Sequence, residues 1–432
     1  MPLRKLALYA VVPAVIALLA GLSLGNPSLW QPAAVASAVL LAIGLGSLPK
    51  FKGYQFTVWI IAAVTAGMIY PGSFVSWGGV KLRDPWLMLL VIQMVMFGMG
   101  VQMSIHDFSG VMKTPRGVVV GIVCHFTIMP LVGFGLTKIF HFEPEIAAGI
   151  ILIGSCSSGL ASNVMAYIAR ANLGLSVTVT AITTLVAPLL TPLLMKILAG
   201  ALVPVSFFKM MMDIIEHVIV PIGAALLHDY LKTASAAGRR NVFIIAAFSA
   251  AWLAFIAFGG WQMLQNALTP VATDPSSYGP AVLKTIGVLG FFMAAVVAGV
   301  LYNLVVTRVP RIEKLMPALS MAGIIYFTTV TTAAGRDNLI KIGFLLFLAS
   351  VIHNAAGYFF GYWGSRLAGL DKNSSRSVAF EVGLQNGGMA SGLAASMGKI
   401  GTVGLAPAIF SPWMNISGSI LANYWGRRPT EK

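Results

Sequence analysis

The sequence is poor in charged residues, and acidic residues are the scarcest of them. Only 9% of its 432 residues are charged, with 13 Asp and Glu against 28 Lys and Arg, while 58% are hydrophobic. In a soluble globular domain about a quarter of the residues are charged. This composition therefore excludes a soluble domain and indicates a protein embedded in the lipid bilayer.

Cysteines and catalytic motifs are equally scarce. The two cysteines, Cys124 and Cys156, both lie in apolar segments, which excludes a disulfide framework. No Walker loop, HExxH or CxxC motif occurs, so neither ATP hydrolysis nor zinc chemistry has support. The apolar segments also contain no nucleophile–base pair, and we expect that the protein is not an enzyme.

The chain consists largely of long apolar segments separated by glycine, proline and charged residues. Their lengths predict an all-α polytopic membrane protein with about 14 transmembrane helices. The predicted spans are 6–24, 32–48, 56–74, 86–105, 117–139, 146–169, 173–199, 207–230, 241–264, 282–306, 316–334, 339–366, 375–396 and 402–424.

The basic residues concentrate in alternate loops, for example at Lys113 and Arg116 and at Lys232, Arg239 and Arg240. This asymmetry follows the positive-inside rule, so the net charge of +15 does not indicate a nucleic-acid partner. It predicts a multi-pass protein of the cell's inner (cytoplasmic) membrane with both termini in the cytoplasm.

We predict that the chain forms two inverted-topology repeats, 1–234 and 235–432, on either side of the basic loop that contains Lys232 and Arg240. Short matches support two repeats. Gly159-Leu160-Ala161-Ser162 and Gly388-Met389-Ala390-Ser391 occupy corresponding places, and His125 and His353 each lie one span earlier.

Two polar, glycine-rich stretches, 154–170 and 377–394, interrupt this apolar pattern. Polar or irregular backbone at membrane depth is tolerated only where it is buried in protein or lines a cavity. Two interrupted helices in corresponding positions of two halves indicate a transport site near the bilayer midplane.

Glu381 lies in the second stretch and is the strongest candidate for an ion ligand. A carboxylate inside a span is costly unless it is paired, protonated or bound to a cation. The amides of Gln385 and Asn386 follow it, and oxygen ligands of this kind suit a hard cation such as sodium. The alternative is a solvated helix end, with Arg376 close by in the sequence.

Ser162, Asn163, Ser176 and Thr180 form a second set of oxygen-bearing side chains. Ser176 and Thr180 are four residues apart, so their hydroxyls share a face of a helix. Each could instead donate to the backbone carbonyl one turn back, as such residues often do in membrane helices.

Several long motifs resemble the bile acid:sodium symporter family. They are MVMFGMGVQM, GIVCHFTIMPLVGF, SNVMAYIARANLGLSVTVTAITTLVAPLLTPLL, EVGLQN and FSPWMNISGSILANYW, in the order of that family. The resemblance covers about 55–232 and 312–425. Segments 1–50 and 238–310 lie outside it, and each reads as a helix pair added to one repeat.

The resemblance implies a panel domain and a core domain in which two broken helices cross. It implies that sodium is transported and is not a prosthetic group. The first implied sodium site comprises Ser162, Asn163, Ser176, Thr180 and Glu381. The second implied site comprises Glu381, Gln385 and the backbone carbonyls near Val382 and Leu384. Asn386 and Asn415 match positions near the substrate cavity.

The chain departs from the family pattern at several positions. His125 replaces a glutamine at the second implied sodium site, where its ring can ligate sodium but would repel it when protonated, which opens proton involvement. Leu160, next to Ala161, and Met414 replace polar residues and make the expected cavity more apolar.

Together these features predict a sodium-coupled symporter of a small organic anion that works by alternating access. A bile-acid-like or pantoate- or keto-acid-like carboxylate is the expected substrate class. The alternative is a proton-coupled carrier or uniporter of the same fold that uses His125. The sequence makes no prediction of the oligomeric state.

Overall fold

The computed structural model describes residues 3–48, 51, 54–272 and 279–428. The described chain is almost entirely helical. Its α-helices are α1 (Leu3–Ser23), α2 (Pro27–Leu45), α3 (Gln55–Ile69), α4 (Pro85–Gly100), α5 (Gly110–Lys113), α6 (Pro115–Phe140), α7 (Pro144–Ser155), α8 (Ala161–Ile168), α9 (Leu173–Ala199), α10 (Phe207–Ile214), α11 (Val220–Thr233), α12 (Ala236–Phe255), α13 (Trp261–Ala272), α14 (Gly279–Arg308), α15 (Arg311–Ala334), α16 (Arg336–Leu367), α17 (Lys372–Gly383), α18 (Gly387–Ser396) and α19 (Leu405–Gly426).

The all-α polytopic class is confirmed, and each predicted span coincides with one helix or with consecutive helices. Within the described residues, nine helical segments are long and apolar enough to cross a membrane individually, or ten if a bent pair counts as one span. That pair, Pro85–Gly100 and Ile105–Lys113, is bent by 66°. The two termini, for which the charge pattern predicts a side of the membrane, lie outside the described residues.

Several helices begin where a polar side chain accepts the free N–H groups of the first turn. Asp84 accepts from the N–H of Trp86 at the start of α4, and Asp371 accepts from Asn373 and Ser374 at the start of α17. A short hairpin of β1 (Ser76–Trp77) and β2 (Val80–Lys81) is a small exception to the helical pattern. Gly78 and Gly79 have φ angles of 55° and 84°, which suit its tight turn.

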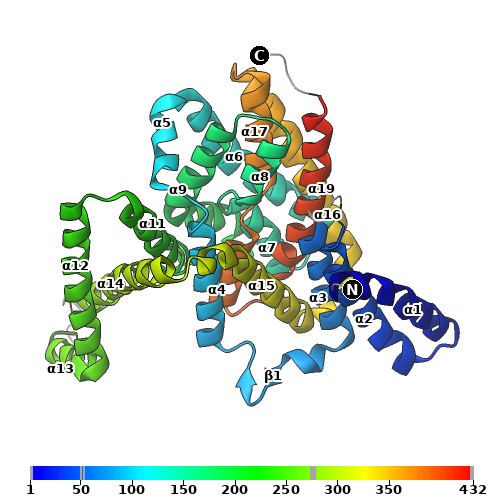
Figure 1. The fold of residues 1–432 in the computed structure, drawn as a ribbon, viewed down its shortest axis with the longest axis horizontal. Coiled ribbons are helices and arrows are strands. Elements are labelled where there is room, and N and C mark those ends of the chain that lie inside the picture. Colours follow the sequence, from blue (N-terminus) through cyan, green and yellow to red (C-terminus); the bar gives the residue numbers. More distant parts are fainter. Residues whose placement is uncertain (1–2, 49–50, 52–53, 273–278, 429–432) are drawn as a thin grey trace.

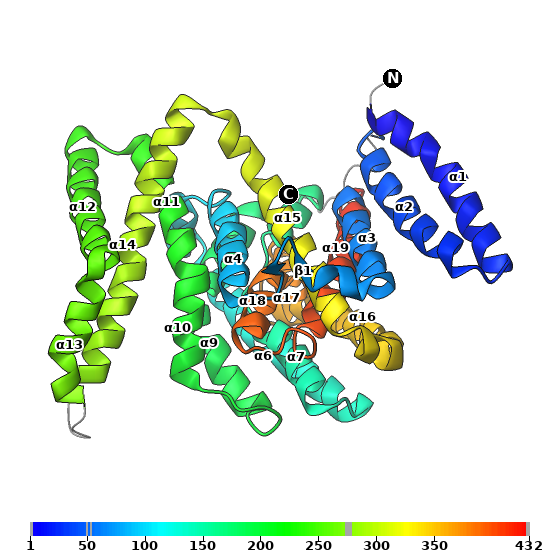
Figure 2. The ribbon, with the colours of Figure 1, turned by 90° about the horizontal axis from the view of Figure 1, so that it is seen from below.

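One group of helices forms a row that we call the panel. Helix α15 packs against α3 and α4, and α4 packs against α11. The predicted extra pairs extend this row: α2 and α1 continue it beyond α3, and α14 and α12 continue it beyond α11. Both views place these pairs at opposite ends of the molecule (Figures 1 and 2).

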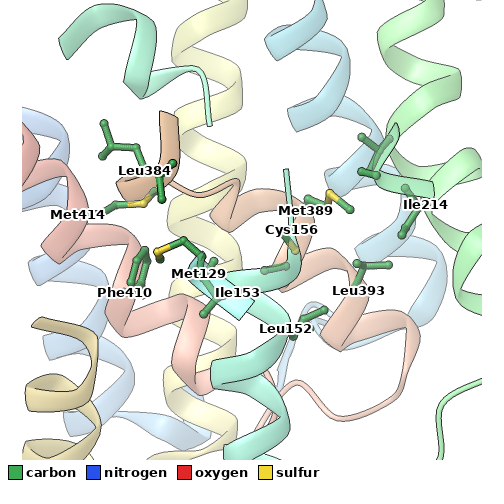
Figure 3. Close-up of a cluster of buried hydrophobic side chains, with 14 of the residues drawn as sticks. Met129, Leu152, Ile153, Cys156, Ile214, Leu384, Met389, Leu393, Phe410 and Met414 are labelled. Atoms are coloured by element: carbon green, nitrogen blue, oxygen red, sulfur yellow. The ribbon is translucent and has the colours of Figure 1, made fainter. Parts of the chain in front are cut away.

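A second group of helices forms the core, in which α6, α9, α16 and α19 pack around two broken helices, α7–α8 and α17–α18. Residues 146–155 of α7, 374–383 of α17 and 387–394 of α18 are all buried. Met129, Leu152, Cys156, Met389 and Phe410 are among the apolar side chains packed around them (Figure 3). The core therefore shields the interruptions of both helices from lipid.

Candidate functional site

The two broken helices cross at their interruptions, where their backbones pair directly. The Gly159 N–H donates to the Leu384 carbonyl at 2.9 Å, and the Asn386 N–H donates to the Ser157 carbonyl at 2.8 Å. Ser158 and Gln385 thus form an isolated antiparallel bridge. These bonds satisfy backbone groups that the breaks would otherwise leave unpaired in an apolar interior.

Side chains also hold the second interruption in place. The Asn386 side-chain oxygen accepts from the Met389 N–H at 2.9 Å and caps α18. From the neighbouring α16, the Asn354 amide donates to the Gly383 carbonyl at 2.8 Å, at the end of α17. Because α7 and α17 end at the crossing while α8 and α18 begin there, partial negative and partial positive charges meet at one place.

Glu381 projects from the last turn of α17 into a cluster of hydroxyl groups. Its side chain has no exposed surface. Ser176 donates to one carboxylate oxygen, and Thr180 donates to the other at 2.8 Å. None of the ion pairs among the described residues involves Glu381. The structure therefore buries this carboxylate with hydroxyl partners and without a cationic side chain, so the solvated helix end is excluded.

The cluster contains more acceptor oxygens than hydroxyl hydrogens. The Asn163 side-chain oxygen lies 3.0 Å from the Ser176 hydroxyl and 3.3 Å from the Thr180 hydroxyl, both of which also contact Glu381. The Ser162 hydroxyl donates to the Gly159 carbonyl at 2.8 Å and lies 3.2 Å from the Thr180 hydroxyl. Each hydroxyl has one hydrogen, so this set of oxygens suits a bound cation.

The structure thus brings together all five residues of the first predicted sodium site. The predicted residues of the second set are also close in space, but their oxygens are engaged. The Glu381 carbonyl contacts His125, the Val382 carbonyl accepts from the Gln385 amide at 2.7 Å, and the Leu384 carbonyl accepts from Gly159. Among the oxygens of this second set, the Gln385 side-chain oxygen is buried and has no hydrogen-bond partner in the described part of the chain.

A cavity of about 340 Å³ lies beside the crossing, between the core and the panel. The predicted substrate-binding residues Leu160, Ala161, Asn386, Met414 and Asn415 all line it. Its described lining residues are uncharged, and most are apolar. The starts of α8 and α18 lie at the cavity, so helix ends, and not basic side chains, supply partial positive charge there.

The panel side of this cavity was not predicted. It is lined by Phe56 of α3, by Met99 of α4 and Gln102 just after that helix, and by Ser320 and Ile324 of α15. Gln102 had a detectable signal, since it is an amide within an apolar run. Phe56 and Ile324 had none, because apolar residues that face a cavity look like those that face lipid.

The chain is similar to several known proteins. The family model described as Sodium Bile acid symporter family matches residues 89–266. An uncharacterized sodium-dependent transporter of Bacillus subtilis is 30% identical over 89% of this chain and 95% of its own length. A probable chloroplastic sodium/metabolite cotransporter of Arabidopsis thaliana is 26% identical, over 86% and 73% of the two chains. The human ileal sodium/bile acid cotransporter is 26% identical, over 69% and 66%.

A solved structure shares the fold. The sodium proton antiporter of Methanocaldococcus jannaschii aligns with a TM-score of 0.52 over 93% of this chain and 99% of its own, at 13% sequence identity. At this identity the match concerns the arrangement of helices alone.

Proposed function

Because the chain belongs to the sodium bile acid symporter family, we propose that it couples the movement of a small organic anion to sodium by alternating access. It is a multi-pass membrane protein, and its relatives are named as transporters rather than enzymes. Sodium in such a protein is a transported ion. The coupling, the substrate class and the residues are our proposal.

The observation that carries the proposal is the buried Glu381 carboxylate among Ser162, Asn163, Ser176 and Thr180. A carboxylate without exposed surface is costly unless it is protonated or compensated by a positive charge, which a bound cation would supply. Hydroxyl and amide oxygens around a carboxylate match the preference of a hard cation. The described residues include no group of three or more His, Cys, Asp or Glu side chains that could hold a transition metal.

The neighbouring cavity supports an organic anion as the co-transported substrate. The starts of α8 and α18 favour a negative group, and the apolar lining favours a hydrocarbon body. With no basic side chain in its described lining, the cavity suits a monocarboxylate better than a multiply charged anion. A sodium/metabolite cotransporter and a bile acid cotransporter among the relatives support the same class.

Alternating access would follow from motion of the core against the panel, because the cavity lies at their boundary. We propose that residues 1–234 and 235–432 are the two inverted repeats, each with one extra helix pair at its end of the panel. The charge pattern supports placement in the cell's inner membrane with cytoplasmic termini.

The test is the thermal stability of the purified protein in a sodium series, with potassium as the control salt. A ligand that binds only the native state stabilises it by about 2.7 kcal/mol at a concentration one hundred times its Kd. We expect sodium-specific stabilisation in the wild type and in the control variant Glu313→Ala, but not in Glu381→Ala. Equal stabilisation by sodium in Glu381→Ala would refute the proposed site, and a response to pH alone would favour the proton-coupled carrier.

A further inference from the structure

His125 makes an unusual pair of contacts at the crossing. Its side chain has no exposed surface, and it reaches from α6 to both broken helices. One ring nitrogen lies 2.8 Å from the Cys156 carbonyl, just past the end of α7. The other lies 2.8 Å from the Glu381 carbonyl, in the last turn of α17. One side chain thus joins the ends of two helices that come from the two halves of the sequence.

Neither carbonyl receives a backbone N–H donor in the described part of the chain. Both belong to helix C-terminal ends, where unpaired carbonyls carry partial negative charge. Two such oxygens directed at one buried point form the kind of place that a cation occupies in a membrane protein. In this structure the imidazole ring occupies it.

The other oxygens expected to hold a second sodium ion are also engaged, by the Gln385 amide at Val382 and by the Gly159 N–H at Leu384. A second sodium ion would share these carbonyl oxygens with the protein donors and would have to displace the His125 ring. The cluster around the Glu381 side chain, by contrast, has more acceptors than hydrogens. The two predicted sites therefore differ in their capacity for a cation.

We propose that the His125 ring permanently fills the second cation place, so that this carrier binds one sodium ion and not two. The inference rests on the proposed function, because it assumes that sodium binds at Glu381. Under it, the unpartnered Gln385 side-chain oxygen, which lies in the wall of the cavity, faces the organic substrate and is not a sodium ligand.

Equilibrium dialysis of the purified full-length protein with radioactive sodium measures the number of bound ions at saturation. The wild type should bind one sodium ion per chain. His125→Gln removes the ring, frees both carbonyls and adds an amide oxygen, so it should bind two. Two sodium ions in the wild type would overturn the inference and leave the proposed function intact. Absence of sodium binding in the wild type would refute the proposed function itself.

A second variant keeps the test decisive if His125→Gln does not fold. Gln385→Ala removes the side chain expected in a second site but none of the oxygens around the Glu381 side chain. The single-ion carrier should retain one bound sodium ion and an unchanged sodium affinity in this variant. A loss of bound sodium, or a tenfold or larger fall in affinity, would show that Gln385 is a ligand and would overturn the inference. Glu381→Ala is the matched control, which should bind none.

Discussion

At the scale of single residues, Gly159 lies in close contact with the second broken helix at the crossing. A Cβ atom at this position would lie 2.6 Å from the Gln385 carbonyl oxygen. This oxygen belongs to the backbone, so a change of side-chain rotamer cannot relieve the clash. We expect Gly159→Ala to push the interruptions of the two broken helices apart. Overpacking of this kind should lower the free energy of unfolding by about 1–3 kcal/mol. It should also abolish the stabilisation of the protein by sodium.

The control is Gly135→Ala on α6, where an added Cβ would meet no atom within 4 Å. It should leave both the melting temperature and the sodium response close to those of the wild type. Thermal unfolding in sodium and in potassium checks both variants. A Gly159→Ala protein with a normal sodium response would contradict the role given to the backbone pairing.

The candidate ligands were predictable at this scale because each one is a polar residue inside an apolar segment. Glu381 and Ser176 come together as the sequence led us to expect. The contacts of His125 were not predictable, because backbone carbonyls carry no residue-specific signal. The Cys156 and Glu381 carbonyls lack other partners because of where α7 and α17 end relative to α6.

At the scale of elements, Asp371 sets the start of α17, the helix that positions Glu381. Its side chain accepts from the N–H groups of Asn373 and Ser374 at 2.8 and 3.0 Å. Partial burial opposes its ionisation, but these hydrogen bonds outweigh that effect and hold the pKa of Asp371 below its ordinary value. Its contribution to stability is therefore present at neutral pH and is lost as the pH falls through this lowered pKa.

We expect Asp371→Ala to lower the free energy of unfolding by about 1 kcal/mol, the usual cost of losing such a cap. Asp371→Asn keeps the accepting oxygen and is the matched control, with a much smaller loss. Thermal unfolding at pH 7 distinguishes the two. Equal losses in both variants would show that the charge of Asp371, and not its cap geometry, stabilises α17.

The helices could be predicted from the lengths of the apolar segments, whereas the bends and irregular turns within them could not. The predicted span 86–105 ends early, because the chain bends by 66° after α4 and Ser104 caps the next turn. A π-helical turn at Ile215–Ile219 joins α10 to α11 without any glycine. The hydropathy of the sequence gives no signal of either feature, so neither could be predicted from it.

At the scale of the whole molecule, the first helix pair is peripheral to the transport site. Helix α1 packs mainly on α2, and α2 packs on α3. Most of the large apolar side chains of α1, such as Leu6, Tyr9 and Ile16, are exposed. We expect deletion of residues 1–48 to preserve the sodium-specific stabilisation and its dependence on Glu381. Its loss in a folded, monodisperse deletion variant would show that the pair supports the site from a distance.

The mass of this variant in detergent tests a separate role. If α1 and α2 form a contact between copies, their removal should reduce the mass of the particle by more than the deleted residues. A reduction equal to the deleted segment would contradict that role.

The long row of panel helices has a mechanical consequence. A bilayer is viscous. When two parts of a protein move against each other within it, the part with more surface in contact with lipid meets more drag and therefore moves less. The added pairs at both ends give the panel that larger lipid-facing perimeter. We therefore expect the panel to behave as the stationary frame in the membrane, while the displacement of each transport cycle falls on the core that holds Glu381.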